Sequence, residues 1–204
     1  MSNIIFHDTE TTGLPNWKIP SDDESQPHMV QLGAIVADSE TRKVIDRLDV
    51  IIKPDEWEIS QEMTDIHGIS QEQAMAEGIP ERDAVNMFLK LWGIELVNPA
   101  LRVAHNRTFD QRIIRIALKR YEYGQEILDK WAGKEDYFCT MLKSKPIMEM
   151  LPKNRYGFKN PKLEEAYEFF TGKKLENAHT AMADSEACME IYWGLEDHVK
   201  KEAK

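Results

Sequence analysis

The order in which strand and helix patterns follow one another constrains the fold of this chain more than any other feature. Apolar runs at residues 4–8, 29–38 and 44–53 predict three strands. The last two are joined by a tight polar turn, so we expect them to be antiparallel. Strand patterns at 101–104 and 137–139 then alternate with helical patterns. Strands first, and then strands alternating with helices, predict an α/β fold with helices on a mixed sheet.

The helical patterns are short at first and become longer toward the end of the chain. Residues 60–78 predict short helical pieces broken at His67-Gly68 and Gly78. Pro80 is expected to begin an amphipathic helix that continues to about Leu96. The other expected helices cover residues 107–121, 140–150, 161–171 and 181–200. A Pro- and Asp-rich loop at 13–28 follows the first strand, and no linker divides the chain, so residues 1–204 are expected to form one domain.

Composition limits the function more than the fold. The net charge of −10 argues against a protein that coats nucleic acid non-specifically, but not against an enzyme that binds one strand end. The sequence has neither a secretory signal nor an apolar run of membrane-spanning length, so we predict a cytoplasmic location without membrane contact. Cys139 and Cys188 stand alone in apolar surroundings and are expected to be reduced, buried residues.

Two carboxylates lie at the end of the first predicted strand. Asp8 and Glu10 are two residues apart, so in an extended chain they point to the same side. They repel each other unless a cation lies between them. Gly13 shortly after them allows a substrate or another backbone to come close. A solvated strand end is the alternative explanation of this pair.

Two further aspartates begin apolar helical stripes, so both are expected to point toward the sheet. The stripe of Asp110 contains Ile113, Ile114 and Ala117, and that of Asp184 contains Ala187, Cys188, Ile191 and Leu195. Asn106 precedes the first of these helices and is expected to cap it. For Asp110 the alternative is an acid that interacts with the helix dipole in the first turn.

His179 precedes Asp184 by five residues, which places it on the loop that enters the last helix rather than on the same helical face. A loop histidine beside a metal site can reach a bound water, although a lone histidine is more often a surface residue or a satisfied core group. Four inward acids with one histidine nearby are typical of a site for two divalent cations that prefer oxygen ligands, Mg²⁺ or Mn²⁺. The sequence holds no Cys/His ligand set for zinc.

At these residues the sequence resembles the DnaQ-like, or DEDDh, 3′→5′ exonucleases of the ribonuclease H-like superfamily. The matching segments follow in the family's order at 7–14 (HDTETTGL), 30–34 (VQLGA), 66–69 (IHGI), 104–110 (AHNRTFD) and 163–195. The histidine five residues before the last aspartate marks the histidine branch of the family. The resemblance implies a central five-stranded mixed sheet flanked by helices. The long loop at 15–28 resembles stand-alone and phage-type members, which weakens the case for a polymerase subunit.

The resemblance also implies a reaction, the hydrolysis of single-stranded nucleic acid from its 3′ end to nucleoside 5′-monophosphates. Asp8, Glu10 and Asp184 are expected to hold one Mg²⁺, and Asp8 with Asp110 a second. Mn²⁺ is expected to substitute. His179 is expected to take the proton of the attacking water. We expect the substrate to be DNA. The alternatives are an exoribonuclease that acts on RNA and a non-catalytic module that binds nucleic acid or a polymerase.

The residues expected to contact the 3′-terminal nucleotide are Thr11, Thr12, Gly13, Leu14, His67, Asn106 and Phe109. For His67 and Phe109, packing in the core is an equal alternative. His7 stands where the family has an apolar residue, so we expect its ring to be buried and either hydrogen-bonded or next to the metal ligands.

Basic residues offer a second set of nucleic-acid contacts. A stretch with interleaved aromatic residues consists of Lys153, Arg155, Tyr156, Phe158, Lys159 and Lys162. Such interleaving suits a strand with exposed bases, although a solvated loop is the more common explanation. Arg107, Arg112 and Arg115 are candidate phosphate contacts. A DNA polymerase or another replication protein is a candidate partner, and the oligomeric state is open.

Overall fold

The computed structural model describes residues 3–96, 99–133, 137–153, 155–176 and 178–202. Its centre is a five-stranded sheet in the order β3-β2-β1-β4-β5. The strands are β1 (Asn3–Thr11), β2 (Met29–Asp38), β3 (Val44–Ile51), β4 (Leu101–Ala104) and β5 (Tyr137–Cys139). β2 pairs antiparallel with both β1 and β3, whereas β4 pairs parallel with both β1 and β5. The predicted five-stranded mixed sheet is therefore confirmed.

Eight helices lie within the described residues: α1 (Gln61–His67), α2 (Gln71–Glu77), α3 (Glu81–Trp92), α4 (Thr108–Arg120), α5 (Gln125–Ala132), α6 (Thr140–Met148), α7 (Leu163–Thr171) and α8 (Ala181–Glu202). The helix predicted to reach Leu96 ends at Trp92, because Gly93 adopts a left-handed conformation and its N–H caps the carbonyls of the last turn. α5 was not expected, because it is only eight residues long and no side chain caps its first turn.

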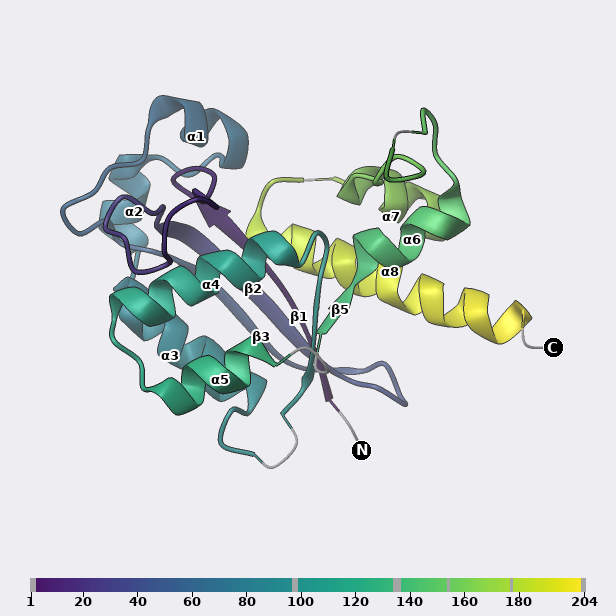
Figure 1. Cartoon of the computed structure of the whole chain (residues 1–204), viewed down its shortest axis with the longest axis horizontal. Helices are drawn as coiled ribbons and strands as arrows, with labels where there is room; N and C mark the ends of the chain where they lie inside the picture. Colours follow the sequence, from purple (N-terminus) through teal and green to yellow (C-terminus); the bar gives the residue numbers. More distant parts are fainter. Residues whose placement is uncertain (1–2, 97–98, 134–136, 154, 177, 203–204) are drawn as a thin grey trace.

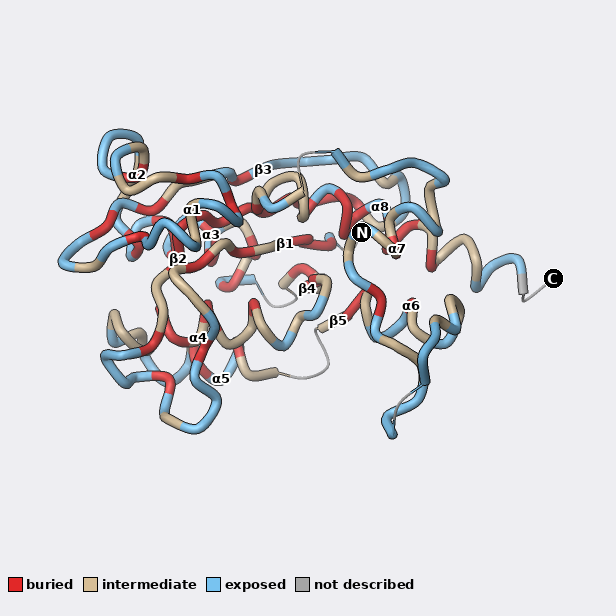
Figure 2. The backbone as a smooth tube through the Cα atoms, turned by 90° about the horizontal axis from the view of Figure 1, so that it is seen from above, coloured by how far each residue is buried: buried red, intermediate tan, exposed pale blue. Residues whose placement is uncertain are grey.

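The helices cover the two faces of the sheet (Figure 1). On one face, Ile5 and Leu32 pack in a cluster with Phe88 of α3 and Trp131 of α5. On the other face, Phe6, Ile35 and Val103 pack against Cys188 and Tyr192 of α8. Figure 2 shows that buried residues follow β1 and the inner sides of the helices, whereas much of the chain that connects the elements is exposed.

Several side chains were predicted to be buried, and most of these predictions are confirmed. Cys139 and Cys188 are buried and free. His7 is buried too, but it lies on the face that packs against Phe88 and Trp131, with ring centroids 5.3 and 6.2 Å away. Neither ring nitrogen has a hydrogen-bond partner among the residues that the structure describes. The expectation that His7 is hydrogen-bonded or next to the metal ligands is wrong, because successive residues of β1 alternate between the faces and Asp8 points to the opposite one.

The start of α8 packs directly on β2 at Gly33. Because Gly33 has no side chain, the backbone of α8 can come close to the strand. A Cβ atom on Gly33 would lie 2.3 Å from the Ala181 carbonyl oxygen and 2.4 Å from its carbonyl carbon. Gly33 pairs with Asp8 in the sheet. This close approach therefore brings the first turn of α8 over the end of β1 where the carboxylates lie.

We expect Gly33→Ala to lower the free energy of unfolding by about 1–3 kcal/mol, because the clash is with backbone that cannot rotate away. The change should also displace Asp184 and reduce activity. Gly124→Ala is the matched control, since a Cβ there meets no atom within 4 Å. Urea denaturation and nuclease assays would measure both effects. Equal stability of the two variants would contradict the packing argument.

Among the residues that the structure describes, no helix combines the length and the apolar character that crossing a bilayer requires.

Candidate active site

Three of the four predicted acidic ligands lie together. One carboxylate oxygen each from Asp8, Glu10 and Asp184 lies within 4.8 Å of the other two. Asp8 and Glu10 come from one side of β1 and Asp184 from the first turn of α8, as the periodicities predict. Carboxylate oxygens are the ligands that Mg²⁺ and Mn²⁺ prefer, so the donor set fits a divalent cation.

Asp110 lies beside this group and is turned toward the sheet, as predicted. It is 1% exposed, and its Oδ1 accepts hydrogen bonds from the Thr9 backbone N–H at 3.1 Å and the Thr9 hydroxyl at 2.9 Å. Thr9 stands between Asp8 and Glu10 on β1. Asp110 is thus tied to the strand that carries the other two acids.

The sequence did not single out the two side chains that hold the start of α8. The Gln31 side-chain oxygen accepts a hydrogen bond from the Ala181 N–H at 3.0 Å. The Ser185 hydroxyl, which follows Asp184, donates to the Gly33 carbonyl at 3.1 Å. Gln31 and Gly33 both belong to β2, so the position of Asp184 depends on the contact between α8 and this strand. Sequence spacing contains no signal for such a long-range contact.

Burial and crowding of the carboxylates raise their pKa values. Burial, with the charges of Asp110, Asp184 and Glu10 in addition, raises the pKa of Asp8 well above its usual range. Burial is also the first cause at Glu10 and Asp110, whose pKa values rise to about 7, and at Asp184, whose pKa rises to about 6. The cluster therefore favours bound protons or a cation over bare negative charge.

This electrostatic strain predicts how the stability of the metal-free protein depends on pH. In the unfolded chain the carboxyls ionise near pH 4, whereas in the folded protein they ionise at about pH 6–7. Between these values the folded state binds more protons, so the free energy of unfolding should fall as the pH rises from about 4 to 7. Mg²⁺ should therefore raise the melting temperature more at pH 8 than at pH 5.5. Differential scanning fluorimetry with EDTA or Mg²⁺ would measure this, and an equal Mg²⁺ effect at both pH values would contradict it.

His179 lies on the loop before α8, as predicted. Its backbone has a positive φ of 72°, and its N–H donates to Asp184 Oδ1 at 3.3 Å. The residue is exposed. Its ring makes no hydrogen bond within the described part of the chain. The structure therefore brings the His179 backbone beside the carboxylates and leaves its imidazole open to solvent.

The residues predicted to bind the terminal nucleotide begin where β1 ends. The Thr11 hydroxyl donates to the Gly13 carbonyl at 2.8 Å. Thr12 is fixed by two contacts with His28: its N–H donates to the His28 carbonyl, and its hydroxyl accepts from the His28 N–H, both at 3.0 Å. Leu14 is 85% exposed. This segment thus presents an apolar side chain on a backbone that is held in place.

His67 is buried at the end of α1 and has one free donor. Its Nδ1 accepts a hydrogen bond from the Ile69 N–H at 3.1 Å, which leaves the proton on Nε2. Nε2 is buried and has no partner among the described residues. Phe109, by contrast, packs against the larger core cluster, as the core alternative predicts.

The prediction that Asn106 caps the following helix is wrong. α4 begins at Thr108 with Arg107 at the cap position, and no side chain bonds the first turn there. Asn106 is exposed with a left-handed φ of 58°, and its carbonyl accepts from the Phe109 N–H. An asparagine tolerates this conformation, so it forms the turn instead of the cap.

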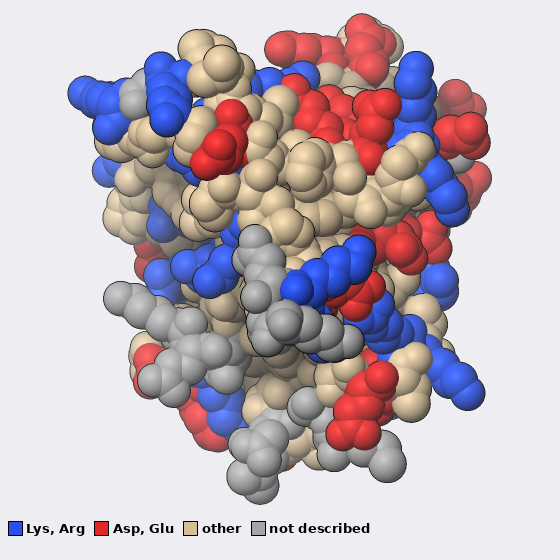
Figure 3. Space-filling view, turned by 90° about the vertical axis from the view of Figure 1, so that its right-hand side faces the viewer, with Lys and Arg blue, Asp and Glu red and all other residues tan. Residues whose placement is uncertain are grey.

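The basic stretch is an exposed connection between α6 and α7. Cations in it stack on its own aromatic rings, with Lys153 Nζ 4.0 Å from the Phe158 centroid and the Arg155 guanidinium 4.6 Å from that of Tyr156. Lys159 and Lys162 form ion pairs with glutamates of α7. The side of the molecule that carries α6 and α7 shows basic and acidic side chains interspersed (Figure 3).

Two of the three candidate arginines on and before α4 contact other parts of the protein. Arg107 lies over the Tyr137 ring at 5.2 Å, and Arg112 donates to the Ile19 carbonyl at 2.6 Å. Arg115 is half-buried next to Arg112. The phosphate contacts expected of these side chains stay a prediction.

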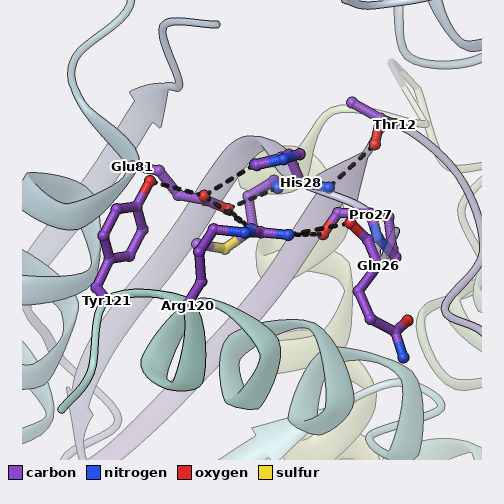
Figure 4. Close-up of polar contacts among 8 residues, drawn as sticks. Thr12, Gln26, Pro27, His28, Glu81, Arg120 and Tyr121 are labelled. Atoms are coloured by element: carbon purple, nitrogen blue, oxygen red, sulfur yellow. Dashed lines mark hydrogen bonds and ion pairs between the residues drawn. The ribbon is translucent and has the colours of Figure 1, made fainter. Parts of the chain in front are cut away.

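A buried glutamate that the sequence did not identify anchors the 13–28 loop (Figure 4). Glu81 of α3 is 3% exposed and accepts hydrogen bonds from the Met29 N–H, Arg120 and the Tyr121 hydroxyl at 3.0 Å each. His28 Nδ1 lies 3.2 Å from Glu81 Oε2, the oxygen that also accepts from Arg120 and Tyr121. Burial acts to raise the Glu81 pKa, but the His28 hydrogen bond and the Arg120 charge hold it below its usual range. The charge is thereby retained inside the protein.

The chain is similar in fold to solved exonuclease structures. Escherichia coli exonuclease I in complex with a dA16 oligonucleotide matches with a TM-score of 0.70 and 24% identity, over 97% of this chain and 41% of the other. The same enzyme with a dT13 oligonucleotide matches with a TM-score of 0.72 and 24% identity, over 99% and 43%. The chain thus spans about two fifths of the length of these proteins. A search of curated proteins found no match.

A family model described as an exonuclease, RNase T, matches residues 5–192. This range contains the three clustered carboxylates, Asp110 and His179, and it covers most of the chain. The family agrees with the DnaQ-like resemblance of the sequence and with the ribonuclease H-like sheet. The chain therefore belongs to the RNase T family of exonucleases.

Proposed function

We propose that this protein removes nucleotides from the 3′ end of single-stranded DNA and releases nucleoside 5′-monophosphates. The observation that carries the proposal is the group formed by Asp8, Glu10 and Asp184 at the end of β1. Three partly buried carboxylates in such proximity are unfavourable unless a cation binds them, and phosphodiester hydrolysis is chemistry that divalent cations support.

Asp8, Glu10 and Asp184 would hold one Mg²⁺ or Mn²⁺, and Asp8 with Asp110 a second. When bound, the two cations supply an activated water and stabilise charge on the leaving 3′ oxygen. Thr9 orients Asp110 through two hydrogen bonds. The backbone bond between His179 and Asp184 keeps the loop histidine close to the site, where its imidazole would accept the water's proton.

The terminal nucleotide would lie along the segment from Thr11 to Leu14. Thr12 is held by His28, so backbone groups of this segment are pre-positioned for the nucleotide. Leu14 would pack against the base. The unpartnered Nε2–H of His67 is a donor for a polar atom of the substrate, since a buried donor without a partner is costly. Asn106 and Phe109 are the remaining residues that we propose to contact the terminal nucleotide.

DNA is favoured because the similar exonuclease I structures contain deoxyoligonucleotides. The chain covers less than half of those proteins, so its own substrate has to be measured. The test is the degradation of matched end-labelled single-stranded DNA, duplex DNA and RNA, with Mg²⁺ or with EDTA. We expect mononucleotide release from the 3′ end of single-stranded DNA with Mg²⁺ and none with EDTA. Faster degradation of RNA would identify an exoribonuclease, and no degradation of any substrate would favour a binding module.

We further propose a single domain that acts in the cytoplasm. Interaction with a DNA polymerase or another replication protein is a prediction that co-purification with the polymerase would test.

A further inference from the structure

The 13–28 loop is folded around a buried polar side chain. Gln26 is 2% exposed. Its side-chain oxygen accepts from the Asn16 N–H at 3.0 Å, and its Nε2 donates to the carbonyls of Asn16 and Pro20 at 3.0 and 2.8 Å. These bonds connect Asn16 and Pro20, in the first half of the loop, to Gln26 near its end. The loop therefore has an interior of its own and holds a defined shape.

Two arginines attach this loop along α4. Arg112 donates to the Ile19 carbonyl at 2.6 Å, and Arg120 donates to the Gln26 carbonyl at 3.0 Å. A helix rises about 1.5 Å per residue, so Arg112 lies only about 3 Å along the axis from Asp110, and Arg120 about 15 Å. The first half of the loop is thus held at the end of α4 that carries Asp110. Figure 1 shows this loop, in dark purple, between the end of β1 and α4.

Trp17 is the large aromatic side chain that this part of the loop presents to solvent. It is 56% exposed, and the Arg112 guanidinium lies 5.7 Å from its ring centroid. Arg112 is itself held by the loop backbone, so the indole is oriented by a fixed cation rather than left free. Leu14, three residues earlier, is exposed as well. The chain that follows the carboxylates at the end of β1 thus exposes two apolar side chains, first Leu14 and then Trp17.

We propose that Trp17 stacks on a nucleobase upstream of the 3′-terminal nucleotide, so that the loop serves as a platform for an unpaired strand. This inference rests on the proposed exonuclease function. An indole can stack on any base, so the contact would be independent of sequence. In a duplex the bases are paired and stacked on each other, so the contact would favour single strands. With a net charge of −10, this chain has little general attraction for phosphates, and stacking would supply affinity that charge does not.

The experiment compares the wild type with Trp17→Ala, Trp17→Phe and the control Phe169→Ala, which removes a 53% exposed aromatic from α7. Each protein is assayed with Mg²⁺ on a 5′-labelled oligothymidylate and on the p-nitrophenyl ester of thymidine 5′-monophosphate, which has no upstream base. We expect Trp17→Ala to raise KM for the oligonucleotide by about 5- to 100-fold and to leave turnover of the ester unchanged. Trp17→Phe should recover most of the affinity, and Phe169→Ala should behave as the wild type.

A series of oligonucleotides with one abasic site at successive positions from the 3′ end locates the contact. One position should weaken binding to the wild type and leave binding to Trp17→Ala unaffected. An unchanged KM in Trp17→Ala, or an equal loss on the ester, would overturn the proposal. If the wild type hydrolysed neither substrate, the proposed function would be wrong. Fluorescence anisotropy of the labelled oligonucleotide in EDTA would then still decide the role of Trp17, because stacking requires no turnover.

Discussion

Asp8→Asn should reduce the rate of 3′-end hydrolysis by about 10³-fold or more while raising the melting temperature of the metal-free protein. The amide has the size of the carboxylate but carries no charge, so it removes a ligand shared by both proposed cations. It also removes a buried charge: burial first, and then repulsion by Asp110, Asp184 and Glu10, raise the pKa of Asp8. For a chain of this length, each kcal/mol of relief corresponds to about 2–4 °C in melting temperature.

The opposite signs make this prediction specific. A variant that merely damaged the fold would lose both activity and stability, whereas loss of a metal ligand should separate them. Initial rates on single-stranded DNA with Mg²⁺ and thermal melts in EDTA at pH 8 measure the two quantities. Glu58→Gln removes an exposed acid outside the cluster and should change neither. Activity at the wild-type rate in Asp8→Asn would show that the carboxylate cluster is not the catalytic centre.

His179→Ala should lower kcat by about 10²- to 10⁴-fold, the contribution of a general base, without loss of metal binding. The ring is exposed and makes no hydrogen bond to a described residue, so its removal should not disturb the fold. The backbone N–H that contacts Asp184 remains in the variant. The Mg²⁺-dependent rise in melting temperature should therefore be retained while the rate falls.

His198→Ala is the matched control, because His198 lies 14 residues beyond Asp184 on α8, about 21 Å along the helix axis. This variant should keep the wild-type kcat. The pH–rate profile gives a further readout, since the limb due to the base should disappear only in His179→Ala. A profile that His179→Ala leaves unchanged would assign the proton transfer to another group.

Local patterns were sufficient to predict the acidic site. Asp8 and Glu10 share a side because a strand alternates, and Asp110 and Asp184 point inward because each begins an apolar helical stripe. Both rules concern residues close in sequence. The same kind of rule failed at Asn106, where a turn and a cap use the same residue type. It also missed α5, which has only eight residues and no side-chain cap at its start.

The 13–28 loop shows the limit of this reasoning. Its composition predicted a loop and nothing about its shape. Gln26, Glu81 and Arg120 look like ordinary surface residues in sequence, yet they become buried partners once α3 and α4 pack beside the loop. Trp17 lies on this loop, exposed and next to Arg112 of α4.

The sequence by itself determined the mixed sheet, the family and which acids face inward, because these follow from periodicity and from motifs of adjacent residues. Only the tertiary structure decided that three carboxylates meet within 4.8 Å, that Asp110 is tied to Thr9, and that His7 faces away from the site. The reason is that these distances depend on how α8 lies on β2. That contact includes the hydrogen bond between Gln31 and Ala181, which are 150 residues apart in the sequence. It is possible because residue 33 is a glycine, which has no side chain to clash with α8.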